Sequence, residues 1–337
     1  MNNCDYEEVN LDDEVGQIIK DGILSEFYNK FIRIGKDGSV FSNLYLYYAE
    51  EIKNFEVYDD DVWVISYPKT GATWTQEMVW MIANNLDFEG SKIPLKERFP
   101  FLEMSVLMER MKMYENKNVS VQVCDASSIE FARQVPRPRF IKTHLPFSLL
   151  PQQIQNGTRT PKLVWVIRNP KDTCVSYYHH GTLLMTWRVC LENFAKVFMA
   201  DKSHYGSYWG HFWSYWNRRH LPNLLVNKYE DMKADLPSTI KVVAKFLNKE
   251  ISEEQVHLLC NHLSFQSMKK NPAVNFEDRI ARIRSMNLIV KDKAFIRSGT
   301  VAKYKEELSP ETIAKFDEWI KQNIAGTEVE NEYIFHI

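Results

Sequence analysis

Four short apolar runs stand out in the pattern of hydrophobic and polar positions. They occupy residues 62–67 (VWVISY), 139–143 (RFIKT), 163–167 (LVWVI) and, less clearly, 224–229 (LLVNKY). Continuous apolar runs of this length are typical of strands in a parallel sheet that is covered on both faces. The pattern therefore predicts four strands of a central parallel β-sheet.

Helical periodicity fills the intervals between these runs. Trp74, Met78, Met81, Ile82 and Leu86 recur on one face of a helix. Helical patterns also cover residues 239–247, 254–263 and 310–323, and the aromatic run 205–216 is interpreted as helix core. Strands that alternate with helices predict an α/β fold, and we expect a single domain.

Two segments depart from this alternation. The polar, acidic start of the chain is interpreted as a partly ordered N-terminal extension (1–54), before a main domain at 55–326 and a C-terminal tail at 327–337. Residues 271–299 are weakly periodic and predict a long loop, which is typical of functional segments. This loop is either a flap that closes over an anion or a solvated run of charges, and its basic residues are Arg279, Arg282, Arg284, Lys291, Lys293 and Arg297.

Composition limits the partners that we expect. With 42 basic and 44 acidic side chains and a net charge of −2, the chain has no general attraction to nucleic acids or anionic membranes. It shows neither a membrane-spanning run nor a signal peptide, and its five scattered cysteines are typical of reduced thiols. We therefore expect a cytoplasmic protein in which any anion site is built locally.

The strongest candidate for chemistry is the segment SYPKTGATWT at residues 66–75. A predicted strand runs through a tight turn into a helix, which directs backbone N–H groups toward an anion such as phosphate. Lys69 adds a charge, and Thr70, Thr73 and Thr75 add hydroxyl donors. Because the lysine precedes the only glycine, Gly71, the turn is P-loop-like but is no triphosphate loop of the type G-x-x-x-x-G-K-[ST]. The alternative is an ordinary turn with an exposed lysine.

Polar residues also follow the next two predicted strands. The segment KTHLP (142–146) ends one strand, and Arg168 ends the other, with Ser176 in the helix that follows. Ligands bind at the carboxyl edge of parallel sheets, where a lysine and a histidine suit charge stabilisation and proton transfer, and an arginine suits phosphate. The alternatives are a histidine that caps its strand and an arginine paired with Asp172.

Six segments, taken in order, resemble the cytosolic sulfotransferase family, including its retinol dehydratase branch. They are YPKTGATW (67–74), KTHLP (142–146), RNPKDTCVSYY (168–178), YEDM (229–232), SFQSMKKNP (264–272) and IRSG (296–299). The resemblance extends from about residue 55 to about residue 326. It implies a five-stranded parallel sheet, transfer of a sulfuryl group from 3′-phosphoadenosine 5′-phosphosulfate (PAPS) with adenosine 3′,5′-bisphosphate as product, and no metal.

The resemblance also assigns roles to individual residues. His144 would be the general base, with Lys69 and Lys142 stabilising charge, and Lys142, Thr143 and His144 would contact the acceptor. The phosphosulfate would be held by Lys69, Thr70, Gly71, Ala72, Thr73 and Trp74. The 3′-phosphate would be held by Arg168, Ser176, Arg297, Ser298 and Gly299, and the nucleoside by Trp74, Tyr229, Leu263, Phe265 and Met268.

The chain departs from the family pattern at four points. Ala72 replaces a hydroxyl residue, Leu263 a threonine and Ser298 a lysine, which leaves donor affinity open. The C-terminal dimer motif is not intact after Lys305, so a homodimer is also left open.

Two apolar segments, 94–114 and 177–187, are candidates for an acceptor pocket or for plain core; the first contains Phe99, Phe101, Leu102, Met104 and Met108. We expect sulfuryl transfer to a lipophilic phenol, sterol or retinoid-like alcohol. The alternatives are dehydration of a retinol-like alcohol through a transient sulfate ester, and a nucleotide-binding protein with decayed catalysis.

Overall fold

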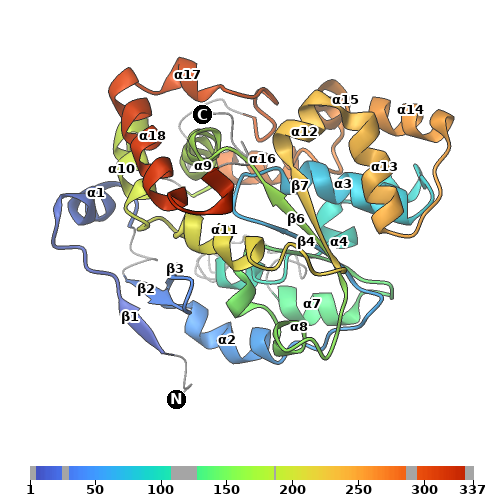
Figure 1. Ribbon diagram of the computed structural model, residues 1–337, viewed down its shortest axis with the longest axis horizontal. Helices are drawn as coiled ribbons and strands as arrows, with labels where there is room; N and C mark the ends of the chain where they lie inside the picture. Colours follow the sequence, from blue (N-terminus) through green and yellow to red (C-terminus); the bar gives the residue numbers. More distant parts are fainter. Residues whose placement is uncertain (1–4, 25–29, 108–126, 186, 286–293, 331–337) are drawn as a thin grey trace.

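A four-stranded parallel sheet forms the centre of the computed structural model (Figure 1), which describes residues 5–24, 30–107, 127–185, 187–285 and 294–330. The strands are β4 (Val62–Ser66), β5 (Phe140–Thr143), β6 (Lys162–Ile167) and β7 (Leu224–Lys228), in the order β5-β4-β6-β7. All four predicted strands and the α/β fold are therefore confirmed. In place of the implied fifth strand, the described residues show one parallel bridge between Phe101 and Lys142.

The register brings the carboxyl ends of the strands to one edge of the sheet. Ile65 of β4 lies beside Thr143 of β5, Ser66 lies beside Val166 of β6, and Ile167 lies beside Lys228 of β7. The chain segments that leave these strands therefore emerge close together. All candidate motifs that follow a strand lie at this edge.

Alternate residues of each strand face opposite layers of helices. Val62, Val64, Val164 and Val166 pack in one core cluster with α3 (Ala72–Ala83), α13 (Leu236–Phe246) and α14 (Glu253–His262). Trp63, Ile65, Leu163, Trp165 and Ile167 pack in the other, with α9 (Pro170–Leu184), α10 (Leu191–Met199), α11 (Tyr208–Trp216) and α18 (Pro310–Ile324). Figure 1 shows the two groups of helices on opposite sides of the sheet.

The predicted helices begin where capping residues stand. Asn169 caps α9 and Ser309 caps α18, each followed by a proline in the first turn, and Ser252 and Gln255 form a capping box at α14. These helices, with α3 and α13, confirm the helical periodicities. The short helices of the main domain are α4 (Leu95–Arg98), α7 (Ser128–Gln134), α8 (Gln152–Gln155), α12 (Tyr229–Ala234), α15 (Phe265–Lys270) and α17 (Tyr304–Glu307), and the 3₁₀ turns among the described residues are Gly90–Lys92, Phe147–Leu149 and Glu328–Glu330.

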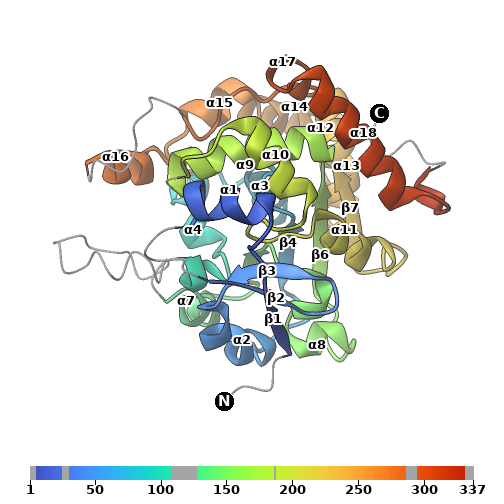
Figure 2. The same cartoon turned by 90° about the vertical axis from the view of Figure 1, so that its left-hand side faces the viewer.

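The described part of the N-terminal segment forms a second, antiparallel sheet. It consists of β1 (Tyr6–Glu8), β2 (Phe31–Ile34) and β3 (Ser39–Ser42), with α1 (Glu14–Gly22) beside α10 and α2 (Tyr45–Lys53) after β3 (Figure 2). The β3 backbone bonds the main domain: Val40 N donates to Gly206 O at 2.5 Å, and Tyr205 N donates to Val40 O at 2.7 Å. Phe41 meets the Tyr205 ring edge-on at 5.2 Å.

The prediction of an unbroken loop at 271–299 is wrong in one part. Residues Glu277–Ser285 form helix α16, which lies against α9 and buries Ile280 completely. A helix with so few apolar positions has weak periodicity, so the pattern did not reveal it. Lys291 and Lys293 of the predicted flap, and Met108 of the predicted acceptor segment, lie outside the described residues.

Candidate active site

The turn between β4 and α3 is held in place by its two threonine hydroxyls. Thr70 Oγ1 donates to the carbonyls of Tyr67 and Val166, both at 2.9 Å, and Thr75 Oγ1 accepts from Asn227 Nδ2 at 3.2 Å. These hydroxyls therefore anchor the turn to β6 and β7. The side chain of Thr70 does not line the cavity described below, in contrast to the expected role as a donor to an anion.

The turn itself has an unusual backbone conformation. Lys69 has a φ of 72° and Gly71 a φ of 117°, in the left-handed region. A Cβ atom on Gly71 would lie only 2.8 Å from Tyr229 Cδ2, so α12 approaches the turn too closely for a side chain there. Glycine at 71 thus leaves the backbone at the start of α3 accessible to a ligand.

Trp74, in the first turn of α3, fixes one wall. Its Nε1 donates to Leu263 O at 2.9 Å, and its ring meets that of Tyr229 edge-on at 5.7 Å. Leu263 therefore contributes a backbone acceptor to this wall, and its own side chain is fully buried. A flat aromatic wall of this kind suits a nucleobase.

His144 lies at the end of β5 with a defined tautomer. Its Nδ1 lies 2.7 Å from Ser66 O and 3.0 Å from Ser66 Oγ. Because a carbonyl oxygen can only accept, Nδ1 carries the proton, and Nε2 keeps a lone pair. The ring is flanked edge-on by Phe101 and Tyr205 at 4.9 and 5.5 Å. Burial, and then the Lys142 charge, hold the pKa of His144 well below its usual value, so the imidazole is neutral near pH 7.

A buried carboxylate, Glu103, organises the segment around His144. It accepts from the backbone N–H of His144 at 2.6 Å and from Thr143 Oγ1 at 2.8 Å, with Tyr205 Oη at 3.4 Å. Burial raises its pKa to about 7, although these donors oppose the rise. The hydroxyl of Thr143 is thus bound to Glu103, and it does not line the cavity.

Two lysines converge on the same space. The Nζ atoms of Lys69 and Lys142 lie 4.2 and 4.0 Å from the ring centroids of Phe295 and Phe101. Burial, and then the charges of Lys142, Arg168 and Arg297, lower the pKa of Lys69 to about 7. Burial lowers the pKa of Lys142 to about 8, while the Glu103 charge partly restores it. Lysines with lowered pKa values in a cavity are typical of functional sites, and a bound anion would stabilise their charged forms.

Arg168 leaves the end of β6 toward this space. Its Nη1 donates to Lys69 O at 3.4 Å, its Nη2 donates to Thr300 O at 3.2 Å, and its guanidinium stacks on the Tyr229 ring at 4.2 Å. Asp172 lies 3.9 Å away, so the ion pair considered from the sequence is present but long. Arg168 Nε is buried and has no hydrogen-bond partner among the described residues.

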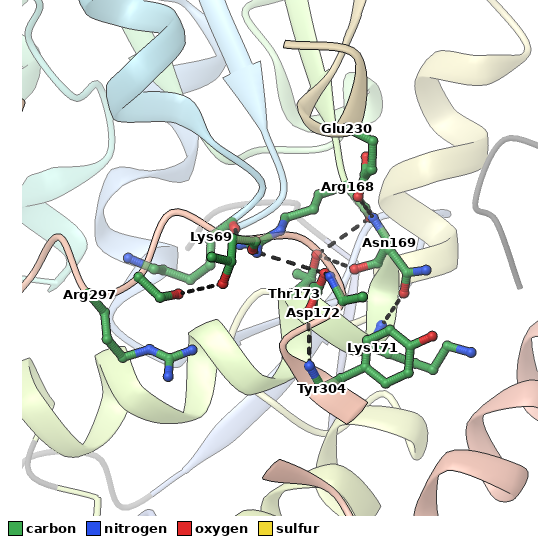
Figure 3. Close-up of polar contacts among 12 residues, drawn as sticks. Lys69, Arg168, Asn169, Lys171, Asp172, Thr173, Glu230, Arg297 and Tyr304 are labelled. Carbon is green, nitrogen blue, oxygen red and sulfur yellow. Dashed lines mark hydrogen bonds and ion pairs between the residues drawn. The ribbon is translucent and has the colours of Figure 1, made fainter. Parts of the chain in front are cut away.

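The start of α9 ties three segments together (Figure 3). The Asp172 carboxylate accepts from the backbone N–H groups of Ala302 and Tyr304 at 2.7 and 3.1 Å. The backbone N–H of Asn169 donates to Glu230 of α12 at 2.9 Å. These bonds hold the loop after residue 299 and the start of α12 beside Arg168.

The segment 297–300 closes one side of the space. Gly299 has a φ of 60°, and a Cβ atom there would lie 2.4 Å from Phe265 Cδ2. Ser298 Oγ accepts from Thr300 Oγ1 at 3.2 Å. Arg297 is ion-paired with Glu307, which also binds His179 Nε2, so its guanidinium shares a carboxylate before any phosphate binds.

These elements enclose one cavity of about 300 Å³. Except for Thr70, Thr75 and Thr143, every predicted site residue lines it: Lys69, Gly71, Ala72, Thr73, Trp74, Lys142, His144, Arg168, Ser176, Tyr229, Leu263, Phe265, Met268, Arg297, Ser298 and Gly299. The predicted acceptor segments contribute Phe101, Met104, Tyr177, Leu184 and Met185, whereas Phe99, Leu102 and Trp187 are buried outside the lining. The cavity therefore has a cationic part and an apolar part.

Sequence reasoning missed several residues of the cavity region. Glu103 had a signal, since it is the one acidic residue within the apolar run 99–108 (FPFLEMSVLM). Three further residues also line the cavity. Tyr205 lies in the run interpreted as helix core, His180 in a segment proposed only in general for the acceptor pocket, and Phe276 in the predicted loop. Among the described residues, no cluster of three or more His, Cys, Asp or Glu side chains is arranged to hold a metal ion, and no described helix has the length and apolarity to span a membrane.

Comparison with known proteins identifies the family. Residues 59–328 match the sulfotransferase domain family. The chain belongs to the sulfotransferase family. This sulfotransferase is 46% identical over 327 residues to luciferin sulfotransferase of Photinus pyralis, and the alignment covers 97% of this chain and 88% of the relative. It is 32% identical over 288 residues to sulfotransferase 1B1 of Mus musculus, covering 83% and 88%. The chain is thus a PAPS-dependent sulfotransferase.

Solved structures resemble this sulfotransferase over nearly its whole length. Retinol dehydratase in complex with retinol and PAP (adenosine 3′,5′-bisphosphate) matches with a TM-score of 0.86 and 31% identity, over 97% of this chain and 98% of that one. The same protein with androsterone and PAP matches with a TM-score of 0.83 and 30% identity, over 96% and 97%. Both structures hold PAP together with a second small molecule, retinol or androsterone.

Proposed function

We propose that this sulfotransferase transfers the sulfuryl group of PAPS, in line, to a hydroxyl of a lipophilic small molecule, with His144 as general base. The observation that carries the proposal is the tautomer of His144. A buried imidazole with its proton fixed on Nδ1 directs a basic Nε2 lone pair into a cavity that also contains Lys69 and Lys142. A neutral imidazole beside two cations is suited to deprotonate a hydroxyl while the cations stabilise developing negative charge.

The cavity fits the nucleotide donor at three points. Arg168 Nε is a buried donor without a hydrogen-bond partner in the described part of the chain, and Gly71 and Gly299 lie where side chains would collide with Tyr229 and Phe265. PAPS supplies an activated sulfuryl group and a bisphosphate leaving group. Lys69 and the start of α3 would hold the phosphosulfate, Arg168, Ser176 and segment 297–299 the 3′-phosphate, and Trp74, Tyr229, Phe265 and Met268 the nucleoside.

Different residues of the chain then accept the proton and neutralise the negative charge. Nε2 of His144 takes the proton of the acceptor hydroxyl, and the Ser66 carbonyl stabilises the resulting imidazolium through Nδ1. Lys69 and Lys142 neutralise oxygens of the group in transfer and of the leaving phosphate. As in phosphoryl transfer, positioning and charge neutralisation supply most of the rate enhancement.

The apolar part of the cavity supports a lipophilic acceptor. Aromatic, leucine and methionine side chains line it, and methionine adapts to varied shapes. The relatives in the structural comparison hold retinol and androsterone, an isoprenoid alcohol and a sterol. Phenols, sterols and retinoid-like alcohols are therefore the acceptor classes to examine.

Dehydration of a retinol-like alcohol is the second candidate. The TM-score of 0.86 to retinol dehydratase favours it. A sulfate ester of the alcohol would form first. Its C–O bond and a neighbouring C–H bond would then break, with hydrogen sulfate as the leaving group and proton carrier, so that the alcohol overall loses water and gains a C=C bond. Mass spectrometry of the product distinguishes a gain of sulfate from a loss of water.

His144→Ala tests the proposal. With labelled PAPS and a panel of phenols, sterols and retinoids, we expect the wild-type chain to label at least one acceptor. Loss of the base in His144→Ala should lower turnover of that acceptor by ~10²–10⁴, while the affinity for PAP measured by calorimetry stays within about threefold of the wild-type value. His220→Ala, an exposed histidine, is the control and should retain activity. Normal turnover by His144→Ala would exclude this base, and PAP binding without labelling of any acceptor would favour a decayed enzyme.

A further inference from the structure

A second histidine, which the sequence analysis did not single out, lies on the cavity side of α9. His180 lines the cavity, as do Ser176 one turn before it and Leu184 one turn after it. Side chains four residues apart on a helix are neighbours. His180 therefore stands between the residue expected at the 3′-phosphate and an apolar residue of the acceptor part.

The surroundings of His180 are aromatic and cationic. Its ring meets Phe295 edge-on at 5.9 Å and lies 6.3 Å from the Tyr177 ring. Lys69 Nζ lies over the same Phe295 ring. Burial, followed by the charges of Lys69, Arg279 and Lys142, holds the pKa of His180 well below its usual value. The side chain is therefore a neutral imidazole with one N–H donor and one acceptor nitrogen.

One ring nitrogen of His180, Nδ1, is buried and makes no hydrogen bond with the described residues. His204 and His211 also have ring nitrogens without a hydrogen bond among the described residues, but they are 2% exposed and do not line the cavity. His180 differs because its side chain lines the cavity, so that a molecule bound there can offer a hydrogen-bond partner to the imidazole. Such a partner removes the free-energy cost of an unpaired polar atom.

We propose that His180 determines acceptor specificity by forming a hydrogen bond with a second polar group of the acceptor, distinct from the hydroxyl that faces His144. This inference rests on the proposed function. The acceptor is accordingly a largely apolar hydroxyl compound with a further oxygen or nitrogen atom. Because Lys69 and Lys142 lie in the same cavity, a carbonyl or carboxylate oxygen suits this place best.

A matched series of naphthols tests the assignment. With PAPS as donor, kcat/KM is measured for 2-naphthol, 6-acetyl-2-naphthol and 6-hydroxy-2-naphthoic acid. Sites that hydrogen-bond a substrate group reject analogues without it, so we expect the wild-type chain to prefer the better of the two polar naphthols over 2-naphthol by at least about tenfold. His180→Phe should reduce this ratio to within about threefold of unity, mainly through the KM of the polar naphthol.

Two further variants separate recognition from folding. Asn at 180 can replace a hydrogen bond made by Nδ1 and Gln one made by Nε2, so one of His180→Asn and His180→Gln should retain part of the preference. His204→Phe makes the same exchange at an unpaired histidine outside the cavity, and its acceptor ratio should match the wild type. Equal losses for all three naphthols in His180→Phe, or a wild-type ratio near unity, would overturn the inference. No sulfation of any naphthol by a wild-type chain that binds PAP would instead overturn the proposed function and, with it, this role.

Discussion

Lys69 holds its ammonium group where burial and neighbouring cations disfavour a positive charge. Its pKa of about 7 and that of Lys142, about 8, describe the cavity without an anion. PAP bound beside these lysines, as we propose, would bring negative charge and raise both pKa values, so the lysines would take up protons on binding. We predict that PAP affinity falls as pH rises above about 7, by up to about tenfold per pH unit for each lysine that must be protonated.

Calorimetry in buffers of different ionisation enthalpy measures this proton uptake directly. In Lys69→Met, Lys142 alone determines the pH dependence of PAP affinity, and the fall in affinity should begin near pH 8 instead of near pH 7. A PAP affinity that is constant between pH 7 and 9 would contradict the lowered pKa values of the two lysines.

At the level of residues, the motifs located most of the cavity, because charged and polar residues after parallel strands share one edge of the sheet. The motifs did not indicate which side chains form hydrogen bonds within the protein instead of facing the cavity. Thr70 donates to two carbonyls and Thr143 to Glu103, bonds that depend on β6 and on a residue 40 positions away. His180 could not be distinguished from a core histidine until the cavity was seen, since periodicity places it on α9 without giving its surroundings.

Among the elements, the strand–turn–helix around Gly71 combines a left-handed backbone with close contact to α12. Gly71→Ala adds a methyl group 2.8 Å from Tyr229 Cδ2 at a φ of 117°. We expect the turn to shift and the affinity for PAP to fall at least about tenfold, since the start of α3 would move relative to its ligand.

Gly157→Ala is the control for this prediction. Gly157 has a φ of 72° with nothing within 4 Å of an added Cβ, so the substitution should cost about 1–2 kcal/mol of stability and leave PAP affinity unchanged. Calorimetry and denaturant titration of both variants separate the two effects. Equal PAP affinity in both variants would show that the contact with Tyr229 is unimportant.

The elements that sequence patterns predicted well are those with strong periodicity or clear caps. The four parallel strands are continuous apolar runs, and α9, α14 and α18 begin at Asn or Ser caps. The patterns failed where elements are short or polar. β1, β2 and β3 have three or four residues each, and the sequence of α16 contains few apolar residues, so these elements leave no distinct period.

For the whole molecule, a buried ion pair links the starts of β4 and β5. Arg139 donates to Asp61 through Nε at 2.9 Å and Nη2 at 2.6 Å, and the two side chains are 2% and 0% exposed. Asp61→Ala leaves a buried guanidinium without its counter-charge, and we predict a loss of about 3–5 kcal/mol in the free energy of unfolding.

The adjacent residue offers a matched control. Asp60 pairs with Arg137 at 2.7 Å, but both side chains are about half exposed, so Asp60→Ala should cost less than about 1 kcal/mol. Urea denaturation of both variants measures the difference. Similar losses would mean that burial of the pair does not determine its contribution.

The pairing of β3 with the segment at Tyr205 limits how far this protein can be truncated from its N-terminus. The family match starts at residue 59, yet Val40 exchanges backbone hydrogen bonds with Tyr205 and Gly206, and Phe41 meets the Tyr205 ring, which in turn packs against His144. A chain shortened to the matched residues would expose to water the face of Tyr205 that supports the proposed catalytic imidazole. The stretch that precedes the family match is thus part of the scaffold behind the proposed chemistry.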